Sequence, residues 1–283
     1  MEKRIGSDIP EQPAWNVGRR AFLGALGALV AAGESSPASD VAIAPSASRI
    51  KLHKLPLTVV DLTNRLAPDK KTAAPNSPRL SMESVDGSGV KVGMLMHRLS
   101  LIEHTGTHID APAHFDKAGR SLGEIPVSDL VVPLAIVDVR SKAASNPDYG
   151  LAPDDILAWE KEHGRLPDGC CVAMLAGHVT IPAPGGTRPQ KRYRGFPGFS
   201  PEVSDFLMKE RNVKGIGSEA GSIDQGTNGP AYPVHQEWLR SGRWGLEGMT
   251  NLDQVPAVGA LLVVGAAPIV GATGIPVRLI ALF

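Results

Sequence analysis

The sequence predicts a mixed α/β domain that is rich in strands and loops. Seven apolar runs have the length of strands, whereas helix signals are fewer. Several of these runs are not interrupted by polar residues, as in sheets that are covered on both faces. The predicted strands span 57–62, 90–95, 131–139, 170–175, 213–216, 260–264 and 277–282.

Two helices are predicted from the residues at their ends. A serine, a proline and a glutamate in succession predict the start of a helix over 201–211, and a glycine ends a second helix over 153–163. Strand 170–175, helix 201–211 and strand 213–216 are expected to form a crossover between parallel strands. The Gly/Pro-rich segment 177–198 is expected to be a surface excursion.

The charge balance argues against polyanionic partners. The chain has 283 residues, with 29 basic and 29 acidic side chains and a formal net charge of zero. Nothing in this balance suggests binding to nucleic acid or to an anionic membrane surface. The expected partner is a small-molecule substrate.

The first fifty residues resemble an export signal. Arg19 and Arg20 precede Phe22, Leu23 and a mild apolar run, which is followed by a Ser/Ala/Pro-rich stretch. This order is typical of a twin-arginine signal peptide. The run is short against the ~20 residues of a membrane span, so cleavage is favoured over an anchor. We therefore expect a signal peptide and linker over 1–49, a single domain over 50–283, a periplasmic or secreted location and no stable membrane anchor.

The cysteines do not form a disulfide framework. Cys170 and Cys171 are the only two in the chain, and a disulfide between neighbouring residues is strained. Both stand at the start of an apolar run, so we expect small buried side chains in a strand.

One short segment carries the strongest functional signal. Between residues 104 and 114 lie three histidines and an aspartate, a rare density of side chains that bind metals: His104, His108, Asp110 and His114. In an extended strand, residues four apart would lie about 13 Å from each other, too far to share one ion. Thr-Gly-Thr and a later proline argue against a helix. A tight turn at Gly106, where positive φ costs little, would bring His104 and His108 together, with Asp110 on the same side.

The segment His-x-Gly-Thr-His-x-Asp-x-Pro-x-His-Phe at 104–115 resembles the hallmark of the Putative Cyclase family, which includes bacterial kynurenine formamidases and isatin hydrolases. Further similarity covers most of the chain from residue 57 to residue 264, with the segments Val-Asp-Leu-Thr at 60–63, Gly-Phe-Ser-Pro-Glu at 198–202, Gly-Ile-Gly-Ser-Glu-Ala-Gly-Ser-Ile-Asp at 215–224 and Gly-Leu-Glu-Gly-Met-Thr-Asn-Leu at 245–252. The resemblance implies a swivelling β/β/α domain that usually forms a homodimer or a larger homo-oligomer.

The resemblance also implies a metal site with one or two ions, either Zn²⁺ or Mn²⁺. Imidazole and carboxylate ligands without a thiolate suit both metals. The implied ligands form two groups that share one carboxylate: His104, His108 and Asp110 in the first, and Asp110, His235 and Glu247 in the second. His114 corresponds to the catalytic acid and base.

The expected reaction is hydrolysis of an amide, either an N-formyl arylamine or a cyclic amide of the isatin type. A metal ion lowers the pKa of its bound water from about 15.7 towards neutrality, and the resulting hydroxide attacks the carbonyl carbon. His114 would accept a proton from the water and return it to the leaving nitrogen, and Glu247 would steer it if not fully occupied as a ligand.

Three alternatives stay open at the level of sequence. The same site could hydrolyse an ester or lactone, because the attack is identical, or it could catalyse a cyclisation. From another class, the chain could be a non-catalytic exported protein that binds a metal or ligand. His114 favours an enzyme, because a pure binding site needs no base beside its ligands.

Overall fold

The computed structural model describes residues 48–52, 55–68, 80–85, 95–177 and 196–283, which all lie in the unit of the chain that spans 43–283. The predicted signal segment apart from its last two residues, the predicted strand 90–95 apart from Leu95, and most of segment 177–198 lie outside the described residues. In the described ranges, no helix is long and apolar enough to cross a bilayer.

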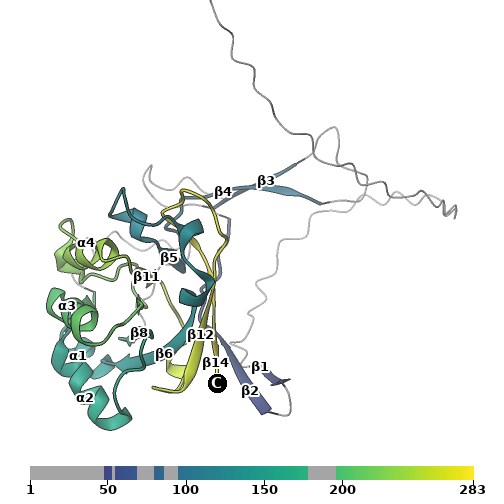
Figure 1. The fold of residues 1–283 in the computed structure, drawn as a ribbon. Helices are drawn as coiled ribbons and strands as arrows, with labels where there is room; N and C mark the ends of the chain where they lie inside the picture. The colour runs from purple at the N-terminus through teal and green to yellow at the C-terminus, as the bar shows by residue number, and fades with distance from the viewer. Residues whose placement is uncertain (1–47, 53–54, 69–79, 86–94, 178–195) are drawn as a thin grey trace, which may run out of the picture. The chain divides into compact units, whose positions relative to one another are not determined.

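The central feature is a mixed sheet, in which ten strands of the described residues pair in the order β1-β2-β14-β12-β6-β8-β10-β11-β5-β13 (Figure 1). Strands β6, β8, β10 and β11 run parallel, and every other pairing in this sheet is antiparallel. The strands are β1 (Ser48–Leu52), β2 (Leu55–Asp61), β5 (His108–Asp110), β6 (Val131–Asp138), β8 (Cys171–Leu175), β10 (Gly215–Ser218), β11 (Trp244–Glu247), β12 (Ala260–Gly265), β13 (Gly274–Pro276) and β14 (Arg278–Leu282).

Helices and two small sheets complete the described part of the chain. In Figure 1, the α-helices gather on one side of strands β6 and β8. They are α1 (Arg140–Ser145), α2 (Pro153–His163), α3 (Pro201–Glu210) and α4 (Pro233–Arg240), and the short 3-10 helices are η1 (Pro112–His114), η2 (Leu122–Glu124), η3 (Val127–Asp129), η4 (Gly226–Asn228) and η5 (Leu252–Gln254). The two small sheets pair β3 (Ser81–Ser84) with β4 (His97–Ser100) and β7 (Gly150–Leu151) with β9 (Gly198–Phe199).

Both predicted helices are confirmed. The Ser200 hydroxyl accepts the N–H of Val203 at the start of α3, and α2 ends at Gly164, whose φ is +87°. The predicted crossover is confirmed by the parallel pairing of β8 with β10. The predicted strand over 213–216 was placed two residues too early, because the N–H of Val213 bonds back to the Leu207 carbonyl and the strand begins at Gly215.

Two apolar clusters lie on opposite faces of the sheet. One cluster receives side chains from strands near both ends of the strand order, β2 and β5, so the sheet must curl around it. The other lies between β6, β8 and β10 and all four α-helices. Cys171 belongs to the first cluster and Cys170 to the second, and both are free and buried. Both are therefore small and buried as predicted, but only Cys171 lies in a strand, because β8 begins at this residue.

The helices do not cover the whole outer face of the sheet. Residues paired across β12, β14 and β2 point to the same side, opposite the first cluster. Five of them are apolar and only partly buried or exposed: Leu261, Val263, Ile280, Leu282 and Val59. The same side also carries the ion pair of Asp61 with Arg278. Neither β12 nor β14 contributes to the cluster beneath the helices. Among the described residues, this part of the sheet presents an apolar surface that is bordered by the Asp61–Arg278 ion pair.

Candidate active site

A turn and a short strand bring the predicted ligands of the first group together. Gly106 has a φ of +68°, as predicted, and the His104 and His108 rings lie 5.2 Å apart between centroids. Thr107 holds the turn in place, because its hydroxyl donates to the Gly248 carbonyl at 2.5 Å. His108 and Asp110 are two residues apart in β5, so both side chains point to one face. Ile109 points to the other face, into the core.

Strand β11 supplies Glu247 by direct pairing. Glu247 lies opposite His108 in the antiparallel register, so the two side chains share a face. Asp110 lies opposite Gly245 on β11 and opposite Gly274 on β13. A side chain at Gly274 would place its Cβ 2.7 Å from His104 Cε1, so this close approach requires glycine.

Helix α4 supplies His235 from the other side. His235 lies in the first turn of α4 and is buried. Its Nε2 lies 2.9 Å from Glu247 Oε1 and 3.5 Å from Asp110 Oδ2. Its Nδ1 is 2.7 Å from Oδ2 of Asp224, a carboxylate with no exposed surface. His235 therefore presents one nitrogen to the site and the other to a buried acid.

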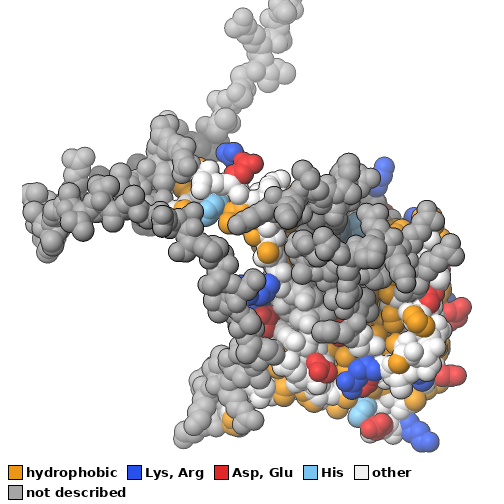
Figure 2. Space-filling view, turned by 180° about the vertical axis from the view of Figure 1, so that it is seen from behind, with side chains coloured by type: hydrophobic (Ala, Val, Ile, Leu, Met, Phe, Trp, Pro, Cys, Tyr) orange, Lys and Arg blue, Asp and Glu red, His pale blue; other side chains and the backbone are white. Residues whose placement is uncertain are grey.

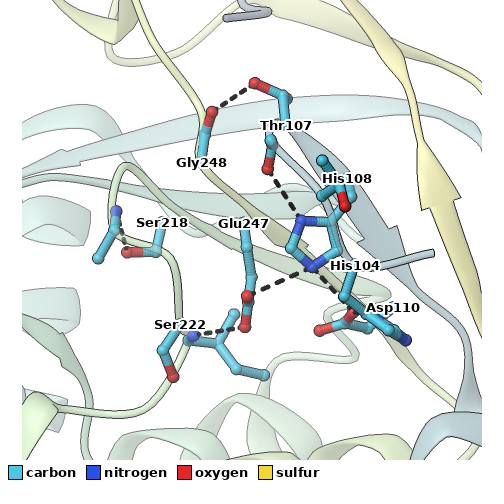
Figure 3. A network of polar contacts seen from close by, with 12 residues as sticks. His104, Thr107, His108, Asp110, Ser218, Ser222, Glu247 and Gly248 are labelled. Carbon is cyan, nitrogen blue, oxygen red and sulfur yellow. Dashed lines mark hydrogen bonds and ion pairs between the residues drawn. The ribbon is translucent and has the colours of Figure 1, made fainter. Parts of the chain in front are cut away.

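Asp110 stands between the two groups of donors. Its Oδ1 lies 2.6 Å from His104 Nδ1 and 3.3 Å from His108 Nε2, while its Oδ2 faces His235. The donor atoms of His104, His108 and Asp110 all lie within 4.8 Å of one another, as do those of the second group. Figure 3 shows the side chains of His104, His108, Asp110 and Glu247 converging. The structure therefore brings together all five residues that the sequence assigned as ligands.

In each of the three candidate ligand histidines, the ring nitrogen that points away from the donor cluster, called the outward nitrogen, has a hydrogen-bond partner. His108 Nδ1–H donates to the Gly106 carbonyl at 2.9 Å, and His235 Nδ1–H donates to Asp224. His104 Nε2 lies 3.0 Å from the Thr273 hydroxyl, which itself donates to Glu103. These contacts assign the hydrogen of each neutral ring to its outward nitrogen, so the inward nitrogens face the carboxylates with lone pairs.

The ring nitrogens and carboxylate oxygens that point into the cluster are arranged to bind a cation. Lone pairs of nitrogen and of carboxylate oxygen repel each other unless a proton or a metal ion lies between them. Among the described residues, neither His108 Nε2 nor Asp110 Oδ2 has a hydrogen-bond partner, although both are buried. No lysine or arginine in the described ranges pairs with Asp110 or Glu247 within 4.0 Å. The donor set of imidazoles and carboxylates suits Zn²⁺ or Mn²⁺.

Without a metal, protons must take this place. Burial by itself would lower the pKa of His108, but Asp110 and Glu247 outweigh it and raise this pKa to about 10. In the same way, burial is outweighed by Asp110, Asp224 and Glu247, which raise the pKa of His235 to about 12. Burial alone would raise the pKa of Asp110, but its three histidine neighbours hold it well below the usual range. The carboxylates thus stay charged and attract positive charge.

His114 lies beside the donors and belongs to neither group. It is the last residue of η1, and its ring stacks on that of His104 with centroids 3.8 Å apart. Burial is the main cause that lowers its pKa below the usual value. Phe115 packs edge-on against His114 at 4.8 Å and lies 5.0 Å from the His235 ring.

Sequence reasoning missed three residues of this site. Asp224 and Thr273 hold the outward nitrogens of two histidines, and Tyr232 places its ring 5.6 Å from that of His235. Asp224 is the last residue of segment 215–224, which carries part of the family resemblance. This resemblance was the one sequence signal that could have indicated a role for Asp224. Its partner stands eleven residues further on, so no local pattern indicated the contact.

Comparison with known proteins decides the family. The family model described as Putative cyclase matches residues 60–225, which is more than half of the chain. The chain belongs to this family. The match includes the whole 104–115 motif, whereas His235 and Glu247 lie beyond its end and join the site in the fold.

Several known proteins resemble this chain over most of their length. An isatin hydrolase of Roseibium aggregatum is 30% identical over 247 residues, covering 79% of this chain and 91% of the relative. A kynurenine formamidase of Salinibacter ruber is 31% identical over 195 residues, covering 68% and 80%. The solved isatin hydrolase A from Labrenzia aggregata, bound to benzyl benzoate, has a TM-score of 0.69 and 35% identity over 80% of this chain and 93% of that one. These likenesses confirm the predicted fold class.

Proposed function

We propose that this chain is a metal-dependent amidohydrolase that cleaves the C–N bond of an N-formyl arylamine or of a cyclic amide of the isatin type. The observation that carries the proposal is the pair of donor groups that share Asp110, with buried donor atoms that have no partner among the described residues. The names of the relatives, isatin hydrolase and kynurenine formamidase, support an amide as the substrate class.

The metal ligands and the base have separate roles. His104, His108 and Asp110 would hold one ion, and Asp110, His235 and Glu247 would hold a second. An ion bound there supplies Lewis-acid activation of water and of the substrate carbonyl. His114, held beside His104, takes a proton from the attacking water at an imidazole nitrogen and returns it to the leaving nitrogen. Glu247 is the second candidate for this proton transfer.

Two aromatic rings next to the donors support an aromatic substrate. Phe115 and Tyr232 lie 6.3 Å apart between ring centroids, and both approach the ring of His235. Tyr232 is 40% exposed, so part of its ring is open to a ligand. Offset or edge-on contacts with an aryl group are favourable at such distances. These rings would orient an aryl amide and keep bulk water from His114.

The test is a hydrolysis screen on purified protein together with metal analysis. The screen compares isatins, N-formyl arylamines, cyclic imides and lactones, each with protein as isolated, with chelated protein and with protein reloaded with Zn²⁺ or Mn²⁺. We expect amide cleavage that is lost on chelation and restored by metal. Cleavage of lactones alone would favour the ester-hydrolase alternative. Metal without any turnover would favour a binding protein, and absence of bound metal would refute the proposal.

We also propose that the chain is a homodimer or a larger homo-oligomer. The apolar surface on β12 and β14 supports this, because a face exposed to water normally carries alternating polar residues. A second copy that docks the same surface would bury both, as two-fold interfaces do. Light scattering should give a multiple of the chain mass, and Leu261→Lys should shift it towards the monomer. A monomeric wild-type protein would contradict the proposal.

Export through a twin-arginine-type signal in residues 1–49 is proposed on the sequence pattern alone. It would give a periplasmic or secreted enzyme without a stable membrane anchor.

A further inference from the structure

We infer that Asp224 is a positioning residue for the metal site. Its carboxylate fixes the ring of His235 so that Nε2, and not Nδ1, faces Asp110 and Glu247. This inference rests on the metal-dependent function proposed above, but it concerns a residue outside both donor groups.

The contacts of Asp224 leave the His235 ring little freedom. Asp224 Oδ2 accepts both Nδ1–H and the backbone N–H of His235, at 2.7 and 3.0 Å. Its Oδ1 accepts the backbone N–H of Val234 at 2.9 Å. The side chain and the backbone of one residue are thus held by one carboxylate. Rotating the ring by half a turn would place the C–H group of the imidazole against a buried anion that needs a donor.

Among the described residues, His235 is the one basic side chain that pairs with Asp224. The residue is fully buried, and no lysine or arginine of the described residues forms an ion pair with it. A buried carboxylate is costly unless it is paired or hydrogen-bonded. Here the amides at the start of α4 and the imidazole of His235 provide its three hydrogen bonds. The acid is therefore stable only with the histidine in the observed orientation.

The segment that carries Asp224 supports the second donor group as a whole. The Ile223 N–H donates to Glu247 Oε1 at 3.1 Å, one residue before Asp224. Two contacts fix this segment: the Asp224 N–H bonds the Ser222 hydroxyl, and the Phe199 N–H bonds the Ile223 carbonyl. His104 and His108 are held by other parts of the chain. The effect of Asp224 should therefore be confined to the ion bound by Asp110, His235 and Glu247.

A carboxylate behind a metal-bound histidine fixes its orientation and raises its basicity. Loss of such a partner usually costs about 10- to 100-fold in metal affinity. Asp224→Asn keeps the size of the side chain but removes the charge and one acceptor. The experiment measures Zn²⁺ affinity and stoichiometry by competition with a chromophoric chelator, for the wild-type chain and for this variant.

Asp155→Asn is the matched control. Asp155 is buried and accepts the Ala152 N–H at the start of α2, so it also supports the start of a helix. None of the five metal-donor residues is among its hydrogen-bond partners. We expect Asp224→Asn to weaken one Zn²⁺ site about 10- to 100-fold and to leave the other unchanged. Asp155→Asn should bind Zn²⁺ as the wild type does. A folded Asp224→Asn protein with wild-type affinity at every site would overturn the inference.

A second measurement does not depend on whether Asp224→Asn folds. In Zn²⁺-loaded wild-type protein with ¹⁵N-labelled histidine, the ring of His235, assigned by the signal lost in His235→Gln, should carry its hydrogen on Nδ1. A hydrogen on Nε2 would overturn the inference. If the wild-type chain binds no Zn²⁺, the proposed function fails first, so the two failures can be told apart.

Discussion

Metal binding to this site should release protons, about one for each ion that binds. The pKa of His108 is raised to about 10 and that of His235 to about 12 in the metal-free protein, so both rings carry an extra proton at pH 7. A metal ligand must be an unprotonated nitrogen. Each donor group contains one of these two histidines, so each ion should displace about one proton.

The number of protons released determines how the affinity for the metal depends on pH. One proton displaced per ion means that each apparent Kd should fall about tenfold per pH unit between pH 6.5 and 8.5. The affinity rises with pH because the pKa values of the two histidines are raised. Below pH 10 the protonated rings stabilise the metal-free protein, so protons compete with the metal for these nitrogens. Calorimetric titration with Zn²⁺ in two buffers of different ionisation enthalpy measures the protons directly.

The control is His235→Ala, which should release about one proton fewer and bind one ion fewer. Calorimetric titrations that show no buffer dependence, together with a Kd that is flat across this pH range, would refute the reasoning. In that case the two imidazoles would be neutral in the metal-free protein, and the carboxylates would not hold the charge assigned to them here.

Three further predictions concern the same molecule. Asp110→Ala should lose most of the bound metal, because both donor groups use this residue, whereas His235→Ala should lose chiefly one ion; elemental analysis with full metal in Asp110→Ala would contradict the shared site. His114→Ala and His114→Gln should keep their metal and lose on the order of 10²- to 10⁴-fold in kcat, the usual contribution of a placed acid and base. Near-normal kcat in either variant would leave His114 a structural residue, and joint loss of metal would make it a ligand. Replacing Arg19 and Arg20 together by lysine should retain the full-length chain in the cytoplasm, and unchanged periplasmic fractionation would reject the signal.

Sequence patterns predicted the parts of the fold whose signals are local. Helix α2 was placed by the glycine after its end, and that glycine lies where expected. The turn at Gly106 followed from a distance argument, since two histidines four residues apart cannot share an ion in a strand. Such inferences need only the residues of one short segment.

The secondary-structure elements that the sequence analysis missed are either too short to show a pattern or depend on residues elsewhere in the chain. Strands β5 and β13 have three residues each, too few for a periodic pattern. Helix α4 begins after Tyr232, which has a φ of +45° and no capping side-chain bond of its own. Its first amides are bound by Asp224, from outside the helix. Only the fold brings that acid to the helix.

Strand β5 limits how this part of the sequence can vary. Its three residues alternate, with His108 and Asp110 turned to the site and Ile109 in the core. A shift of one residue in the pairing of β5 with β11 and β13 would turn the strand over and exchange these environments. The carboxylate would then enter an apolar cluster, and isoleucine would face the site. The register of β5 is therefore as strict a requirement as the composition of the turn before it, where Gly106 has a positive φ and Thr107 bonds the Gly248 carbonyl.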